Sequence, residues 1–76
     1  MNYSEFIEYF NKGGGFAEHE VNAMRHGQLL FNTLVNVNPE VAAWIRGSIF
    51  DPFYKDINSI NPDTFVMIEE KWEAFK

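Results

Sequence analysis

The feature that most constrains the fold is a helix-start signal that occurs three times after residue 37. The pairs are Asn38-Pro39, Asp51-Pro52 and Asn61-Pro62. Asparagine or aspartate caps a helix N-terminus with its side chain, and proline suits the first helical position because it has no N–H to leave unpaired. We therefore expect a helix from residue 39 that ends at Gly47, a turn or two of helix around Phe53 and Tyr54, and a final helix from residue 62.

The start of the chain shows the apolar spacing of an amphipathic helix. Apolar side chains recur at i, i+3, i+4 and i+7 over residues 3–10, and Asn2 and Glu5 have the spacing of a capping box. This pattern predicts a helix over about residues 3–12. The triplet Gly13-Gly14-Gly15 should end the helix and act as a flexible connector, because glycine weakens helices and strands alike.

A second apolar stripe predicts one long helix over about residues 17–36, the longest element and the central scaffold of the fold. Gly27 lies inside this helix, where glycine costs about 1 kcal/mol relative to alanine. Its presence indicates that another helix or an aromatic ring packs directly on its backbone.

Together these elements predict an all-α fold. The 76 residues have room for a single helical domain over residues 1–76. No alternating apolar and polar run is long enough for a sheet, and the connections suit antiparallel neighbours. The apolar face of the final helix comprises Phe65, Ile68, Trp72 and Phe75. We expect a compact bundle or orthogonal array of about four helices plus one short helical turn.

The charge of the chain limits its possible ligands. Six Lys and Arg residues face eleven Asp and Glu residues, so the formal net charge is −5. Direct binding of nucleic acid needs clustered cations and is not expected. No apolar run approaches the roughly 20 residues of a membrane span, and the first residues lack the features of a signal peptide. Since cysteine is also absent, we expect a cytoplasmic protein with no membrane partner.

The sequence shows no apparatus for catalysis. His19 and His26 are its only histidines, and their spacing is too long along a helix for an ordinary chelate. The serines and threonines show no nucleophile elbow or triad spacing, and the glycine triplet lacks the lysine and the strand of a phosphate loop. We expect neither enzymatic activity nor a metal or other cofactor.

One group of polar residues lies beside the most apolar run of the chain. The group comprises Arg25, Gln28 and Asn32. Their spacing of i, i+3 and i+7 allows hydrogen bonds to the third helix or to the loop at residues 51–54, with Arg25 or Arg46 paired to Asp51 or Asp56. We expect this group, together with Arg46 and Asp51, to organise the loop. Contact with a partner is the alternative.

Surface side chains remain as the place where function could reside. The candidates for contact with a partner protein are Phe50, Phe53, Tyr54, Glu69, Glu70 and Glu73. Aromatic anchors dominate interface energies, whereas acidic residues interrupted by Lys71 are also typical of a solvated helix face. A homodimer that buries aromatic residues and an acidic mimic of DNA are the two alternatives.

A sequence pattern runs through roughly residues 23–57. Its parts are R-x-G-Q-x-x-F-N-x-L from Arg25, P-x-x-A-x-x-I-R-G from Pro39 and D-P-F-Y from Asp51. With this pattern the chain resembles a family of small uncharacterised proteins of phages and bacteria, for which no activity is established. The resemblance implies a phage-encoded protein that binds a host or defence protein in the host cytoplasm and modulates or inhibits it.

Overall fold

The computed structural model describes residues 1–56 and 58–74, and within them the chain forms five α-helices and no strand. The helices are α1 (Tyr3–Asn11), α2 (Glu18–Ala23), α3 (His26–Val37), α4 (Pro39–Ile45) and α5 (Pro62–Ala74). The prediction of a small all-α fold is therefore confirmed. None of the helices in this described part of the chain is long and apolar enough to cross a membrane.

Side-chain caps fix three of the predicted helix starts. At α1, Asn2 Oδ1 accepts from the N–H of Glu5 and Glu5 Oε1 accepts from the N–H of Asn2, both at 2.8 Å. At α4, Asn38 Oδ1 accepts from the N–H of Val41 at 3.2 Å. Asn61 Oδ1 accepts from the N–H two residues further on, at 2.9 Å, where α5 begins. The capping box and the starts of α4 and α5 are confirmed, because each depends on residues close together in the chain.

The second helix is not continuous from residue 17 to residue 36, so that prediction is wrong. The backbone is extended at Met24 and Arg25, with ψ angles of 147° and 154°, and this separates α2 from α3. Neither residue is a helix breaker, and the apolar spacing continues across the interruption. The cause is a contact between Gly27 and a loop nearly thirty residues further along the chain.

Gly27 is in direct contact with the loop that joins α4 to α5. Its N–H, which a continuous helix would donate to residue 23, donates instead to the carbonyl of Lys55 at 2.8 Å. An ideal Cβ on Gly27 would overlap the carbonyl oxygen of Pro52. A close neighbour on this glycine was expected, but the neighbour is loop backbone, where a helix or an aromatic ring had been predicted.

Gly14, the middle residue of the glycine triplet, is packed against α3, although the triplet was predicted to be a flexible connector. Gly14 has a φ of 63°, a conformation that glycine adopts without steric cost, and its N–H donates to Tyr9 O at 3.0 Å. An ideal Cβ at this position would overlap Oγ1 of Thr33, a buried residue of α3. The turn after α1 therefore depends on glycine for close packing as well as for its backbone angle.

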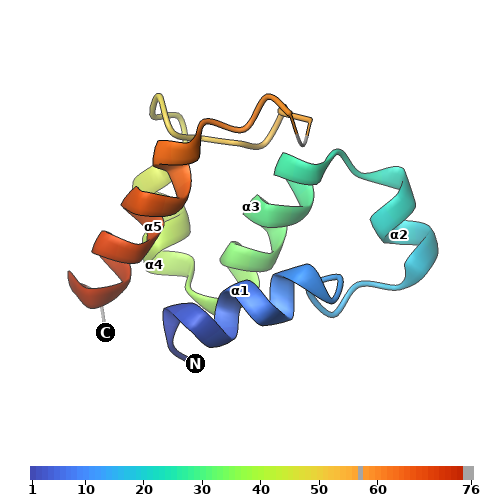
Figure 1. Cartoon of the computed structure of the whole chain (residues 1–76), viewed down its shortest axis with the longest axis horizontal. Coiled ribbons are helices and arrows are strands. Elements are labelled where there is room, and N and C mark those ends of the chain that lie inside the picture. The colour runs from blue at the N-terminus through green and yellow to red at the C-terminus, as the bar shows by residue number, and fades with distance from the viewer. Residues whose placement is uncertain (57, 75–76) are drawn as a thin grey trace.

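The helices are arranged around α3 (Figure 1). In this view α3 is central, α1 crosses its lower end, and α4 and α5 lie to one side with α2 on the other. Among the described elements, α3 contacts α1 and α4, and α4 contacts α5. The molecule measures 34 × 25 × 17 Å, so it is flattened, and much of α2 and α4 stays near solvent.

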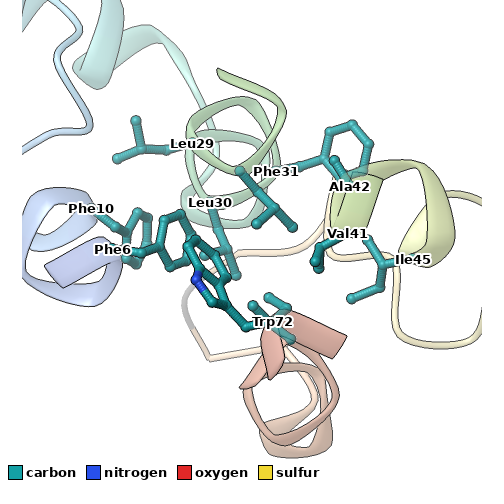
Figure 2. Close-up of a cluster of buried hydrophobic side chains, with 11 residues drawn as sticks. Phe6, Phe10, Leu29, Leu30, Phe31, Val41, Ala42, Ile45 and Trp72 are labelled. Carbon is teal, nitrogen blue, oxygen red and sulfur yellow. The ribbon is translucent and has the colours of Figure 1, made fainter. Parts of the chain in front are cut away.

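The core lies where α1, α3, α4 and α5 converge (Figure 2). It comprises Phe6, Phe10, Leu29, Leu30, Phe31, Leu34, Val41, Ala42, Ile45, Ile68 and Trp72. On the predicted face of α5, Ile68 and Trp72 are buried and Phe65 is half-buried, while Phe75 lies outside the described residues. Val35, which continues the apolar stripe of α3, is 41% exposed.

Three aromatic rings join the two ends of the chain. The ring centroids of Phe6 and Trp72 are 5.0 Å apart, and those of Tyr3 and Trp72 are 6.2 Å apart in an edge-to-face arrangement. Trp72 Nε1 donates to Met1 O at 3.1 Å, and the hydroxyl of Tyr3 donates to Phe65 O at 3.3 Å. The polar atoms of the cluster therefore have partners.

The Tyr3 hydroxyl makes stability depend on pH in alkaline solution. Burial raises the pKa of Tyr3 above 10.0, and the negative charge of Glu69 adds to the shift. Because the folded protein holds this proton more tightly than the unfolded chain, the stabilisation is complete below the unfolded pKa and is lost as the pH rises through the folded one. We expect Tyr3→Phe to lose less stability than the wild type between about pH 9 and pH 11, measured by urea unfolding. Equal losses would contradict this, and Tyr54→Phe, at an exposed ring, is the control.

Candidate protein-binding surface

The loop between α4 and α5 begins with a turn held by Asp51. Its Oδ2 accepts from the N–H of Gly47 at 2.8 Å, and its Oδ1 accepts from the N–H of Phe53 at 3.0 Å. Lys55 then donates its N–H to Pro52 O at 2.8 Å, so the predicted turn or two of helix is a single hydrogen-bonded turn. The carboxylate of Asp51 organises the loop by accepting from backbone donors at both ends of the turn.

Three further contacts tie this loop to the helices. Arg25 Nη1 donates to Tyr54 O at 3.1 Å, and Arg25 Nε lies 3.8 Å from Asp56 Oδ1. The hydroxyl of Thr64 on α5 donates to Phe50 O at 2.9 Å, and this threonine is buried. With the bond from Gly27 to Lys55, the loop is attached to α3 at one end and to α5 at the other.

The side chains of Gln28, Asn32 and Arg46, also predicted to organise the loop, form no hydrogen bond to it within residues 1–56 and 58–74. Asn32 Nδ2 donates to Met24 Sδ at 3.3 Å, so it binds a residue in the interruption between α2 and α3. Gln28 is half-buried and has no side-chain hydrogen bond to any residue in 1–56 or 58–74. Arg46 is exposed, and its guanidinium likewise has no polar partner within these ranges. Of the four basic and amide side chains predicted to organise the loop, Arg25 alone is hydrogen-bonded to it in the part of the chain that the structure describes.

The aromatic residues of the loop form a chain of rings that runs from the core to solvent. Phe53 packs edge-to-face on Phe31 of α3 with centroids 5.7 Å apart, and Tyr54 packs on Phe53 at 4.9 Å. Tyr54 is 77% exposed, whereas Phe53 is half-buried. Phe50 is also half-buried and packs against the core. Tyr54 is therefore the outermost ring of the series.

Two adjoining hollows lie along the seam between α3 and α4. The loop hollow has a volume of about 420 Å³ and is lined by Phe31, Arg46, Gly47, Asp51, Phe53 and Tyr54. The helix hollow, of ≈ 150 Å³, is lined by Phe31, Val35, Pro39, Ala42, Ala43 and Arg46. Because Phe31 and Arg46 line both hollows, we treat them as one surface, the α3–α4 groove.

Small side chains on α4 open this groove. Figure 2 shows Phe31 and Ala42 side by side at the edge of the core between the two helices. Two of the α4 residues that line the helix hollow beside Phe31 are alanines, Ala42 and Ala43, and Ala43 and Val35 are exposed. A groove with an aromatic floor and alanine walls lets another backbone or side chain approach closely.

Sequence reasoning missed most of the helix hollow. Val35 continues the apolar spacing of the predicted helix over residues 17–36, which is typical of a core position, and Ala43 and Pro39 carried no functional signal. Their exposure depends on which side of α4 faces α3, and the short apolar pattern of α4 does not determine this. Ile49 was also missed, although at 85% exposed it is the most exposed large apolar side chain of the described residues.

The acidic candidates lie on a different part of the surface. Glu69, Glu70 and Glu73 are exposed on α5, and none of them lines either hollow of the α3–α4 groove. Lys71, which interrupts them in sequence, has its Nζ 4.3 Å from the ring centroid of Trp44 on α4. The structure therefore separates the acidic residues of α5 from the aromatic residues of the loop.

The histidines occupy unrelated positions. His26 packs edge-to-face on Phe10 with centroids 5.0 Å apart, while His19 is exposed on α2. Within the part of the chain that the structure describes, no group of three or more His, Cys, Asp or Glu side chains is placed to hold a metal ion.

Comparison with known proteins gives no relative for this chain. No family model matches it, and no curated protein or solved structure is detectably similar. A function for the α3–α4 groove therefore has to be argued from its own geometry.

Proposed function

We propose that this chain is a small non-enzymatic protein-binding module that acts in the cytoplasm through the α3–α4 groove and the exposed side chain of Tyr54. The observation that carries the proposal is that Tyr54 combines an exposed side chain with a fixed backbone. Its side chain is 77% exposed beside the groove, yet its backbone is held by Arg25 and by the turn at Asp51. A surface aromatic fixed in this way loses little conformational freedom on binding, which is how strong interface anchors act.

The partner that we propose is a host protein or a defence factor, which the module modulates or inhibits. The resemblance of residues 23–57 to small phage and bacterial proteins supports this choice. The groove lies within that stretch, so the residues that carry the resemblance include Phe31, Pro39, Arg46 and Tyr54.

The test is an affinity capture from bacterial lysate with matched variants. Tyr54→Ala removes the proposed anchor, and Ala43→Gln fills the helix hollow with a larger neutral side chain. Val66→Gln is the control, because Val66 is an exposed apolar residue of α5, at 51%, that lines neither hollow. We expect a protein that the wild type and Val66→Gln retain and that the two groove variants lose, with Tyr54→Ala binding about 30-fold more weakly.

Two outcomes would contradict the proposal. One is the absence of any retained protein that depends on Tyr54 and Ala43. The other is a wild-type chain whose mass by light scattering is twice 8.9 kDa and whose self-association is lost in both groove variants. The second result would assign the groove to a homodimer instead of a partner protein.

A further inference from the structure

The α3–α4 groove contains an unpaired positive charge in a negatively charged protein. The chain carries a formal charge of −5, and of its five described Lys and Arg residues two form ion pairs and Lys71 lies over the ring of Trp44. Lys12 pairs with Glu8 at 3.3 Å, and Arg25 lies near Asp56. Arg46 instead lines both hollows, and its guanidinium has no hydrogen bond or ion pair with residues 1–56 or 58–74. A cation without a partner in these ranges favours a partner that brings a negative charge to it.

Asp51 lines the loop hollow beside Arg46 but forms no salt bridge with it. Each carboxylate oxygen of Asp51 accepts a backbone N–H, from Gly47 and from Phe53. Asp51 also lines only the loop hollow. Among the described residues that line the helix hollow, Arg46 alone is charged, and it lies beside Val35, Ala43 and Phe31.

We propose that the partner segment is acidic and apolar: it places a bulky apolar side chain in the helix hollow and a carboxylate on the guanidinium of Arg46. This inference rests on the proposed function, because it names the chemistry of the partner at the same groove. An arginine fork matches a carboxylate with two parallel hydrogen bonds, and such charge-assisted bonds are strong when water is excluded from one side. A polyanionic nucleic acid is disfavoured, because its phosphates need several clustered cations and Arg46 is the one Lys or Arg among the described residues that line the two hollows.

The first step of the test is selection from a random peptide display library. The immobilised proteins are the wild type and Arg46→Glu. We expect peptides recovered on the wild type to place Asp or Glu within a few positions of Leu, Ile, Phe or Trp. Peptides recovered on Arg46→Glu should replace these acids with Lys or Arg. Recovery of basic peptides on the wild type would overturn the inference.

The second step measures affinity with one synthetic peptide from the wild-type selection, by fluorescence anisotropy. We expect Arg46→Gln to weaken binding at least 10-fold and Arg46→Lys to weaken it less. The matched control is Lys55→Gln, because Lys55 is an exposed cation of the same loop that lines neither hollow, and it should change binding less than 3-fold. Changing the acidic residue of the peptide to its amide should weaken binding to the wild type but should not further weaken binding to Arg46→Gln.

The variants distinguish failure of the acidic partner from failure of the protein-binding module itself. If Ala43→Gln and Tyr54→Ala abolish peptide binding but Arg46→Gln does not weaken it, the acidic partner is overturned and the protein-binding module stands. If no recovered peptide depends on Ala43 or Tyr54, both proposals fall. Binding of a single-stranded oligonucleotide that competes with the peptide would also overturn the acidic partner in favour of a phosphate ligand.

Discussion

Replacing Gly27 with alanine is expected to destabilise the protein by about 2–4 kcal/mol, although alanine is the better helix former by about 1 kcal/mol. The new Cβ would overlap the carbonyl oxygen of Pro52 and lie 2.7 Å from that of Lys55. Both contacts are with backbone, so no flexible side chain can move aside. The loop would have to withdraw, and the buried N–H of Gly27 would lose its bond to Lys55, which costs about 1–3 kcal/mol when no water replaces it.

The control for this prediction is Gly47→Ala. Gly47 has a φ of 74° but nothing within 4 Å of an ideal Cβ, so alanine there costs only the backbone strain of about 1 kcal/mol. Urea unfolding followed by far-ultraviolet circular dichroism measures both variants. A Gly27→Ala protein as stable as the wild type, or more stable than Gly47→Ala, would show that α3 and the loop are not in contact.

The contact at Gly27 also marks the limit of what the sequence could predict about the fold. The capped starts at Asn2, Asn38 and Asn61 depend on residues within three positions, and all three were predicted. The interruption at Met24 and Arg25 depends on a loop nearly thirty residues away. Nothing in the local sequence opposes a helix there, so only the tertiary contact decides the outcome.

The candidate surface was predictable to a smaller degree, and for a related reason. The aromatic residues of the 51–54 turn stood out by type, and Phe53 and Tyr54 do line the groove. Arg25 or Arg46 was expected to pair with Asp51 or Asp56. The structure places Arg25 near Asp56, whereas Asp51 accepts from two backbone N–H groups. Competition between side-chain and backbone donors for one acceptor depends on the path of the turn, which residue types do not reveal.

A substitution at Phe6 should have the other large effect. Phe6 is fully buried at the junction of α1, α3 and α5, and its ring packs on Trp72 at 5.0 Å. Truncation of a buried phenylalanine to alanine costs about 3–5 kcal/mol, through lost burial and the cavity left behind. A domain of 76 residues has a total stability of only about 4–11 kcal/mol, so Phe6→Ala should leave a substantial fraction of the protein unfolded at 37 °C.

Tryptophan fluorescence measures this effect directly. Trp72 is 4% exposed and Trp44 is 38% exposed, so a Trp44→Phe background isolates the buried indole next to Phe6. In that background, Phe6→Ala should shift the emission to longer wavelength and lower the urea midpoint. Phe6→Leu keeps most of the apolar volume and should cost less than about 2 kcal/mol. Equal stabilities for the alanine and leucine variants would mean that the ring of Phe6 does not fill the junction. Because α1 does not line the α3–α4 groove, Phe6→Leu should also retain partner binding, which separates loss of fold from loss of the binding surface.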